Sequence, residues 1–538
     1  MKKSKLILIV FSSFTLFQFL LISKNQIPLS IDEAERYLSA KTINTNGNSL
    51  FPVPTFYLIP FSLSNNTIYQ ARIPQLLAGL FLLLTMWLLM QKMAGKILKE
   101  KLIFIYLALI IVISPWLQSL ILFHLPETLS LIFFCLAIII LIKITEDSDN
   151  KKHWILLEIS MLLFAFSSWP GLIVSFIFPI FIFLFFRKTF RQYVLFFTLI
   201  LFAILGVYII KNFNHIRIFT LENTFINQIT PKKLADEIND RQKIDFLASN
   251  RQFILPNYVR KFIYNKPFLA FEKTFKKTVS FFDFEQFAYP SISYDITSLS
   301  GILPKGNLPL GYFWEIPLLF LGLYAFLTQK NRYKTLIILI PLLLLPSLFF
   351  EKRDLLTTGF LVVPFLLFLE IYGLHQILKI SKALPKTVFK AFSVTLLVLI
   401  ILTIYEQYKL IYLNKFSYQT SDLYFYKEIA KSISSEKDNF SKIVVTDRIG
   451  PTNLMAAFYL DTPPEKLERL EFRPISFPQE NVSENTLFIG LPGEFTKPGE
   501  NPNGLSLPPN LTLINEITAP DELVYHYGKN LWMVTSKQ

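Results

Sequence analysis

Long apolar runs recur along residues 5 to 408 of the chain. An α-helix of about 20 apolar residues crosses the roughly 30 Å of hydrocarbon in a bilayer. The pattern therefore predicts about eleven membrane-spanning helices. They are expected at residues 5–22, 71–91, 102–119, 125–143, 154–169, 170–187, 192–211, 312–328, 334–350, 356–378 and 387–408.

The polar stretches between the runs predict the orientation. Short cytoplasmic loops of membrane proteins carry an excess of Lys and Arg. Every second loop has this composition: QKMAGKILKEK, KITEDSDNKKH, FRKTFRQ, TQKNRYK and KISKALPK. The N-terminus is therefore expected in the cytoplasm, with residues 23–70, residues 212–311 and the tail on the outer face. We divide the chain into a membrane region, residues 1–412, and an extracytoplasmic domain, residues 413–538.

The outer segment 212–311 is too long for a simple connection. The stretch TPKKLADEINDRQK predicts a helix with Thr230 as N-cap and Pro231 in its first turn. Residues 265–282, NKPFLAFEKTFKKTVSFF, set Phe and Leu against Lys and predict a helix that lies flat in the lipid headgroup layer. The alternative is that this second helix merely packs on the membrane helices.

The tail has a different pattern, in which short apolar runs alternate with polar and Pro-rich turns. The stretches YKEIAKSISS and TNLMAAFYL predict helices. The stretches KIVVTD, TLFIG, LTLINEI and LWMVTSK predict strands. A small α/β domain, acting as a lid or a recognition module, is expected.

Composition agrees with a membrane protein, because 52% of residues are hydrophobic and only 17% are charged. The net charge of +14 belongs in part to the cytoplasmic loops, and no basic surface indicates a nucleic-acid partner. The single cysteine, Cys135, falls inside an expected span, so it predicts a buried side chain and neither a disulfide framework nor a thiolate zinc site. Phosphate-binding glycine loops, HExxH and CxxC are absent from the sequence.

Charged residues cluster in PLSIDEAERYLSAK, residues 28–41, directly after the first apolar run. One interpretation is structural, since Ser30 and Glu33 fit a capping box and Asp32 would interact with the helix dipole. The apolar face of this short interfacial helix would consist of Ile31, Ala34 and Leu38. The other interpretation is chemical, because two carboxylates would then lie at the outer surface, where a lipid-linked substrate presents its polar head.

Further motifs follow in a recognisable order. FPVPTFYLIPF occupies residues 51–61, and ARIPQLLAG, residues 71–79, contains Arg72. Glu127 lies in HLPETLSLIFF, and PSLFFEKRDLLTTGFLVVP spans residues 346–364. In this order the chain resembles the polytopic GT-C glycosyltransferases that use polyprenyl-phosphate sugars, which include protein O-mannosyltransferases and aminoarabinose transferases of lipid A. The resemblance covers the topology of the membrane region.

The resemblance implies a GT-C-like helical membrane fold and transfer of a sugar from a polyprenyl-phosphate donor to a protein, lipid or glycan acceptor. Such transfer requires a base that takes the acceptor proton. Asp32 is the predicted base, Glu33 a supporting carboxylate and Glu127 a second acid. A divalent metal ion held by Asp32 and Glu33 is left open, since no cluster in the sequence requires one.

The departing phosphate requires cations, and a guanidinium binds phosphate oxygens in a bidentate manner. Arg72, Arg353 and Lys352 are the predicted phosphate-binding residues. Two of the site residues also have structural interpretations. Arg72 fits an interfacial anchor that reaches the headgroups, and Glu127 fits an exposed acid at a helix start.

Two other function classes remain open. A polytopic lipid or sugar transporter shares the expected topology, but it is expected to show repeated halves or broken helices with polar midplane groups, and the sequence has no internal repeat. A non-catalytic envelope-assembly protein would keep the tail domain and tolerate loss of Asp32.

Overall fold

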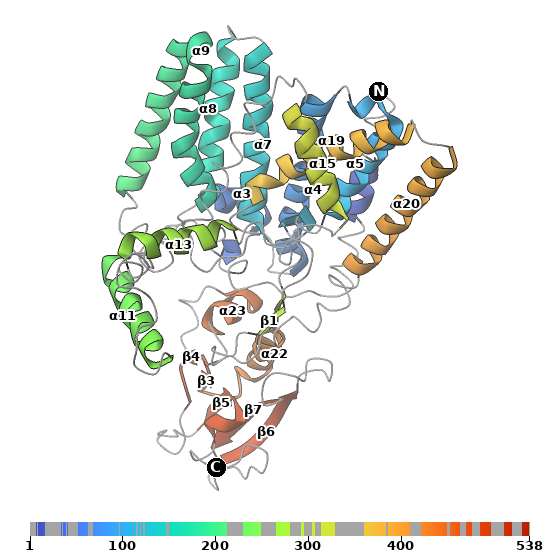
Figure 1. Ribbon diagram of the computed structural model, residues 1–538. Helices are drawn as coiled ribbons and strands as arrows, with labels where there is room; N and C mark the ends of the chain where they lie inside the picture. Colours follow the sequence, from blue (N-terminus) through green and yellow to red (C-terminus); the bar gives the residue numbers. More distant parts are fainter. Residues whose placement is uncertain are drawn as a thin grey trace.

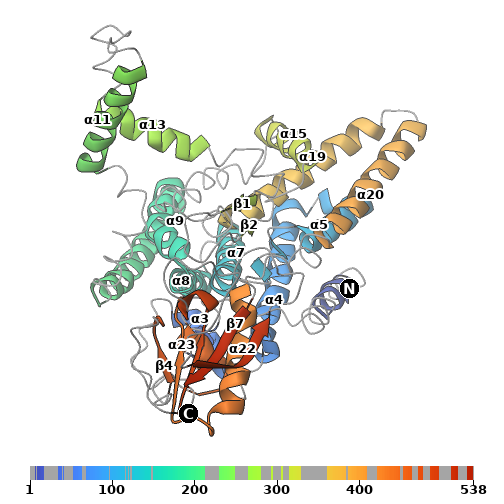
Figure 2. The same cartoon turned by 90° about the horizontal axis from the view of Figure 1, so that it is seen from below.

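A computed structural model gives the architecture (Figures 1 and 2). It describes residues 7, 9–16, 34, 36–38, 40, 52–62, 68–95, 97–114, 117–118, 120–121, 124–146, 150–211, 230–248, 265–279, 292–294, 304–306, 314–328, 360–382, 386–408, 421–448, 452–462, 470–475, 485–495, 511–518 and 530–536.

Helices dominate the first three quarters of the chain. They are α3 (Pro52–Ser62), α4 (Ile68–Ala94), η1 (Ile97–Lys99), α5 (Lys101–Ile113), α7 (Leu125–Glu146), α8 (Lys151–Ala165), α9 (Trp169–Lys211), α15 (Glu315–Thr328), η4 (Phe360–Val362), α19 (Val363–Lys382) and α20 (Lys386–Tyr408). Among the described residues, three stretches are long and apolar enough to cross a membrane: Arg72–Ala94, Leu125–Glu146 and Phe360–Ser381. The helical, membrane-associated class is thereby supported, while the count of eleven spans stays a prediction.

A continuous apolar core joins these helices. Helical residues 9–16 pack on α4, where the ring centroids of Phe11 and Trp87 are 6.4 Å apart in an edge-to-face arrangement. Helix α4 in turn lies along α7, where the Cys135 sulfur is 3.4 Å from the Met86 sulfur. Cys135 is fully buried, so its predicted structural role is confirmed.

The segment α9 covers two of the expected spans, and its chain reverses direction between them. It contains 43 residues, and in a straight helix Phe176 and Phe202 would be about 39 Å apart. Their ring centroids are 5.8 Å apart, and Phe166, just before α9, lies 4.8 Å from Tyr208 near its end. The reversal therefore lies between Phe176 and Phe202, which includes the basic loop FRKTFRQ expected to separate two spans.

Helices α15 and α19 cross at two glycines. A Cβ on Gly322 would overlap the carbonyl oxygen of Leu369, and a Cβ on Gly373 would overlap that of Leu318. Small residues allow helix backbones to approach this closely, which increases van der Waals contact where the hydrophobic effect is weak. Positions 322 and 373 therefore both require glycine.

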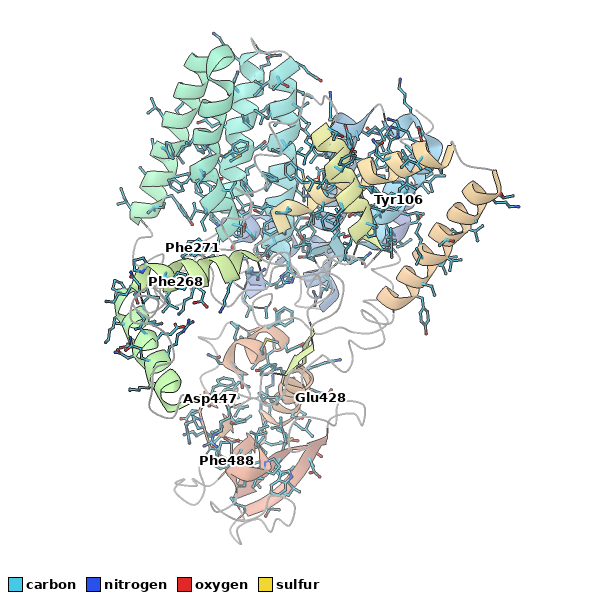
Figure 3. The ribbon with its side chains drawn as sticks, viewed as in Figure 1. Tyr106, Phe268, Phe271, Glu428, Asp447 and Phe488 are labelled. Atoms are coloured by element: carbon cyan, nitrogen blue, oxygen red, sulfur yellow. The ribbon has the colours of Figure 1, made fainter. Side chains whose placement is uncertain are left out.

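The long outer segment contains two helices, α11 (Pro231–Ala248) and α13 (Lys266–Val279), and a short antiparallel hairpin of β1 (Ile292–Tyr294) and β2 (Pro304–Gly306). The predicted helix start at Thr230 and Pro231 is confirmed, because the Leu234 amide donates to the Thr230 carbonyl at 3.0 Å. Figures 1 and 2 show α13 crosswise to α7 and α8. Leu269 is buried, whereas Phe271 on the same helix is 64% exposed (Figure 3). The location of α13 in the lipid headgroup layer stays a prediction.

The tail forms a mixed five-stranded sheet in the order β4-β3-β5-β7-β6. Its elements are α22 (Ser421–Glu436), β3 (Lys442–Val445), α23 (Thr452–Tyr459), β4 (Leu470–Phe472), β5 (Thr486–Gly490), η7 (Pro492–Glu494), β6 (Leu511–Thr518) and β7 (Asn530–Ser536). Strands β3, β4 and β5 are parallel, and β7 is antiparallel to both β5 and β6. Both helices and the four strands expected here are present, whereas β4 was not foreseen. The boundary proposed at residue 412 lies outside the described residues.

The core of this domain includes residues from the other end of the sequence. Ala34, Tyr37 and Leu38 are buried in the same apolar cluster as Tyr426 of α22 and Phe458 of α23. Residues 34, 36–38 and 40 are helical, as expected. The predicted interfacial role of Ala34 and Leu38 is wrong, because these side chains pack against the C-terminal domain and not against lipid.

Candidate functional site

Two predicted site residues are brought to the same end of neighbouring helices. The Gln75 amide of α4 and the Thr128 hydroxyl of α7 both donate to the Leu120 carbonyl oxygen, each at 2.7 Å. Arg72 lies one turn before Gln75, and Glu127 directly precedes Thr128. Arg72 and Glu127 therefore lie on the helix ends that this hydrogen-bonded junction joins.

Helices α4 and α7 run side by side in the same direction. Their opposite ends are joined by an ion pair in which Lys92 Nζ lies 3.7 Å from Glu146 Oε2. Both N-termini consequently lie on one face of the helical region. Helix N-termini carry partial positive charge, so this face favours an anion.

Arg72 is buried, with 2% of its surface exposed. A side chain that reached outward to lipid headgroups would lie on the protein surface, so the interfacial-anchor interpretation is wrong. A guanidinium in the protein interior is costly unless anionic groups compensate it. The predicted phosphate-binding role of Arg72 stays a prediction.

Glu127 lies in the first turn of α7 and is half-buried. The expected helix-start location is therefore correct, although the side chain is not fully exposed. A carboxylate in the first turn is stabilised by the helix dipole. Glu127 thus satisfies the structural interpretation and also lies close to the proposed site.

Helix α3 covers this end of the helical region. The Tyr57 hydroxyl donates to the carbonyl oxygen of Pro74, two residues after Arg72, at 3.0 Å. The Val53 amide donates to the Phe166 carbonyl in the turn between α8 and α9 at 3.4 Å. The Pro-containing segment that the sequence placed before the second span therefore contacts α4 directly.

Four predicted site residues, Asp32, Glu33, Lys352 and Arg353, lie outside the described residues, and their roles stay predictions. The described chain resumes at Ala34, which is fully buried. Within the described ranges, no group of three or more His, Cys, Asp or Glu side chains is arranged to hold a metal ion.

A buried polar cluster between α5 and α19 was not predicted from the sequence. Tyr106 lies on α5 (Figure 3), and its hydroxyl donates to Glu370 Oε2 of α19 at 3.4 Å. The Trp314 ring lies 6.2 Å from the Tyr106 ring. Glu315 and Glu370 are each 3% exposed. The signal in the sequence was an acid inside the apolar run VPFLLFLEIYGL, because ionisable residues within membrane helices are rare and commonly functional.

Together these features define a helical, membrane-associated protein with a C-terminal domain built on a mixed sheet. No family model matches the chain, and no curated protein matches it either.

Proposed function

We propose that the chain is a membrane glycosyltransferase that moves a sugar from a polyprenyl-phosphate donor to a protein, lipid or glycan acceptor. The observation that carries the proposal is the buried Arg72 at the same helix ends as Glu127. A cation held away from water interacts strongly with a phosphate, because the low local dielectric strengthens the attraction.

The chemistry assigns a role to each residue. The acceptor oxygen attacks the anomeric carbon while the bond between that carbon and the phosphate oxygen breaks. Asp32 takes the acceptor proton, Glu33 supports it or binds a divalent metal, and Glu127 is a second acid. The bonding electrons leave with the polyprenyl phosphate, whose added charge is stabilised by the phosphate-binding cations Arg72, Arg353 and Lys352.

The expected orientation places this reaction on the outer face of the cytoplasmic membrane. The lysine-rich loops lie in the cytoplasm, and the acidic segment and the C-terminal domain lie outside. The donor then enters laterally from the membrane lipids, while the acceptor arrives from the envelope.

The assignment of Asp32 is tested with a purified Asp32→Asn variant reconstituted with polyprenyl-phosphate sugars. Loss of the base is expected to lower the rate of transfer by at least about 100-fold while the protein stays folded. Asp438→Asn, in an exposed turn of the C-terminal domain, is the matched control and is expected to retain the wild-type rate. Unchanged transfer in folded Asp32→Asn would remove the catalytic assignment.

A second candidate function, transport of a lipid or sugar, is favoured by the polar cluster of Tyr106, Glu315 and Glu370. Buried acids in membrane helices commonly mark ion or substrate pathways. Flux through proteoliposomes that is lost in Glu370→Gln, without any sugar transfer by the wild-type chain, would favour the transporter.

A further inference from the structure

The C-terminal domain and the first outer segment share one apolar core. Ala34, Tyr37 and Leu38 are 0%, 1% and 6% exposed. They pack with Tyr426 and Phe458, which lie on the two helices that cover one face of the sheet. Figure 1 shows α22 and α23 on the side of the sheet that faces the membrane helices. The apolar core of the domain therefore includes Ala34, Tyr37 and Leu38.

Tyr37 contacts both this domain and helix α3 of the membrane region. Its ring meets that of Phe458 edge to face, with centroids 5.8 Å apart and planes at 77°. Its hydroxyl donates to the carbonyl oxygen of Phe61, in the last turn of α3, at 2.8 Å. Aromatic pairs of this geometry are favourable beyond the area they bury, and the buried hydroxyl keeps a partner.

The contacts continue from α3 to the proposed phosphate-binding residue. Tyr57, one turn before Phe61, donates to Pro74 in the first part of α4. Pro74 is two residues from Arg72. A continuous series of packed rings and hydrogen bonds thus joins Phe458 of the domain to the helix end that carries Arg72. Tyr37 lies in the middle of that series, and the predicted carboxylates Asp32 and Glu33 directly precede its buried helical segment.

We propose that Tyr37 is a positioning residue, held between α23 and α3, through which the C-terminal domain sets the placement of Arg72. The domain is then part of the catalytic unit and not a separate recognition module. This inference rests on the proposed function for its catalytic consequence, but the mechanical coupling of the domain to α3 stands on the described contacts alone.

The coupling is tested by amide hydrogen exchange on the purified full-length chain. Phe458→Ala removes the ring against Tyr37 and is expected to speed exchange in residues 34–40 and in α3 by about tenfold or more, because local opening governs exchange. Helix α8 serves as the internal reference and is expected to stay unchanged. Faster exchange confined to α22 and α23 would overturn the coupling.

The catalytic consequence is tested with Tyr37→Phe, which keeps the ring and removes only the hydrogen bond to Phe61. Misplaced catalytic groups lower turnover, so kcat is expected to fall about tenfold or more. KM for the donor is expected to rise as well, because Arg72 is the proposed ligand of the donor phosphate. Tyr324→Phe, which removes an exposed tyrosine hydroxyl on α15, is the matched control and is expected to behave as wild type. A purely structural role would reduce the yield of folded protein and leave kcat per folded molecule unchanged.

The two experiments separate the possible failures. Wild-type protein that transfers no sugar from any polyprenyl-phosphate donor would overturn the proposed function, while the exchange measurement would still decide the coupling. Wild-type protein that transfers sugar, combined with unchanged kcat in Tyr37→Phe, would overturn the positioning role and leave the proposed function standing.

Discussion

Arg72, at the N-terminal end of α4, is 2% exposed. A guanidinium buried in this way requires anionic or polar groups beside it. Its planar fork of N–H groups matches phosphate oxygens, whereas a lysine ammonium is a compact point charge. The proposed role of Arg72 therefore depends on guanidinium geometry as well as on charge.

Arg72→Lys tests this dependence at the residue scale. Losing the bidentate pair of charge-assisted hydrogen bonds is expected to lower kcat/KM for the donor about 10- to 100-fold. The measurement is steady-state transfer by protein whose unfolding midpoint matches the wild type. Lys92→Gln, at the opposite end of the same helix and 41% exposed, is the control and is expected to have little effect. Wild-type kinetics in a folded Arg72→Lys protein would contradict bidentate phosphate binding.

At the scale of elements, the crossing of α15 and α19 leaves no space for a side chain at Gly322. Gly322→Ala is expected to destabilise the protein by about 1–3 kcal/mol, because the added methyl must separate two helix backbones. Gly206→Ala on α9 is the matched control, since a Cβ there meets nothing within 4 Å. Thermal unfolding in detergent measures both. Equal midpoints for the two variants would show that the crossing tolerates a methyl group.

The pairing of α11 with α13 depends on charge. Arg241 bridges Glu237 at 2.8 Å and Glu272 at 2.9 Å, and Lys276 also contacts Glu272. Hydrogen bonds from Lys276 and Arg241 hold the pKa of Glu272 below its ordinary value of 4.5. Burial alone would raise the pKa of Glu237, but hydrogen bonds from Lys273 and Arg241 outweigh it and lower that pKa as well. These side chains form an ion-pair network between the two helices.

This network predicts a pH dependence with a defined sign. A carboxyl whose pKa is lowered by folding adds stability at pH values above its unfolded pKa. That contribution is lost as the pH falls through the lower, folded-state pKa. Amide protection factors in α11 and α13, which correct the exchange rate for its intrinsic pH dependence, are therefore expected to be high at neutral pH and to fall below about pH 4. Glu272→Gln is expected to weaken this dependence and to leave the part that Glu237 contributes. Protection factors that vary with pH as in the wild type would contradict the role of Glu272.

At the scale of the whole molecule, the C-terminal domain is expected outside the cytoplasmic membrane and the lysine-rich loops are expected in the cytoplasm. Thiol labelling of intact cells tests this orientation. Asp438→Cys, in an exposed turn of the C-terminal domain, is expected to react with a membrane-impermeant reagent. Lys151→Cys, at the exposed start of α8, is expected to react only after the membrane is opened. The native Cys135 is fully buried and gives no background. The opposite labelling pattern would place the candidate site in the cytoplasm and contradict the proposed function.

Local patterns predicted much of this architecture. Long apolar runs predicted α4, α7 and α19, and short apolar runs between polar turns predicted β3, β5, β6 and β7. These elements are predictable because they depend on residues that are neighbours in the sequence. The burial of Arg72 was not foreseeable, since an arginine at a helix start fits both a headgroup anchor and an interior cation. Contacts between distant segments, such as Tyr37 with Phe458 and Tyr106 with Glu370, leave no periodic signal and emerged only from the structure.

The shared core of the C-terminal domain has a consequence for biosynthesis. The ribosome makes Tyr37 near the beginning of the chain and Phe458 near the end, so the first outer segment emerges long before its packing partners exist. The buried side chains Ala34, Tyr37 and Leu38 therefore stay uncovered until the C-terminal domain has been made. A chain that ended before α22 would lack both Tyr426 and Phe458, and it is expected to be degraded faster than the full-length protein.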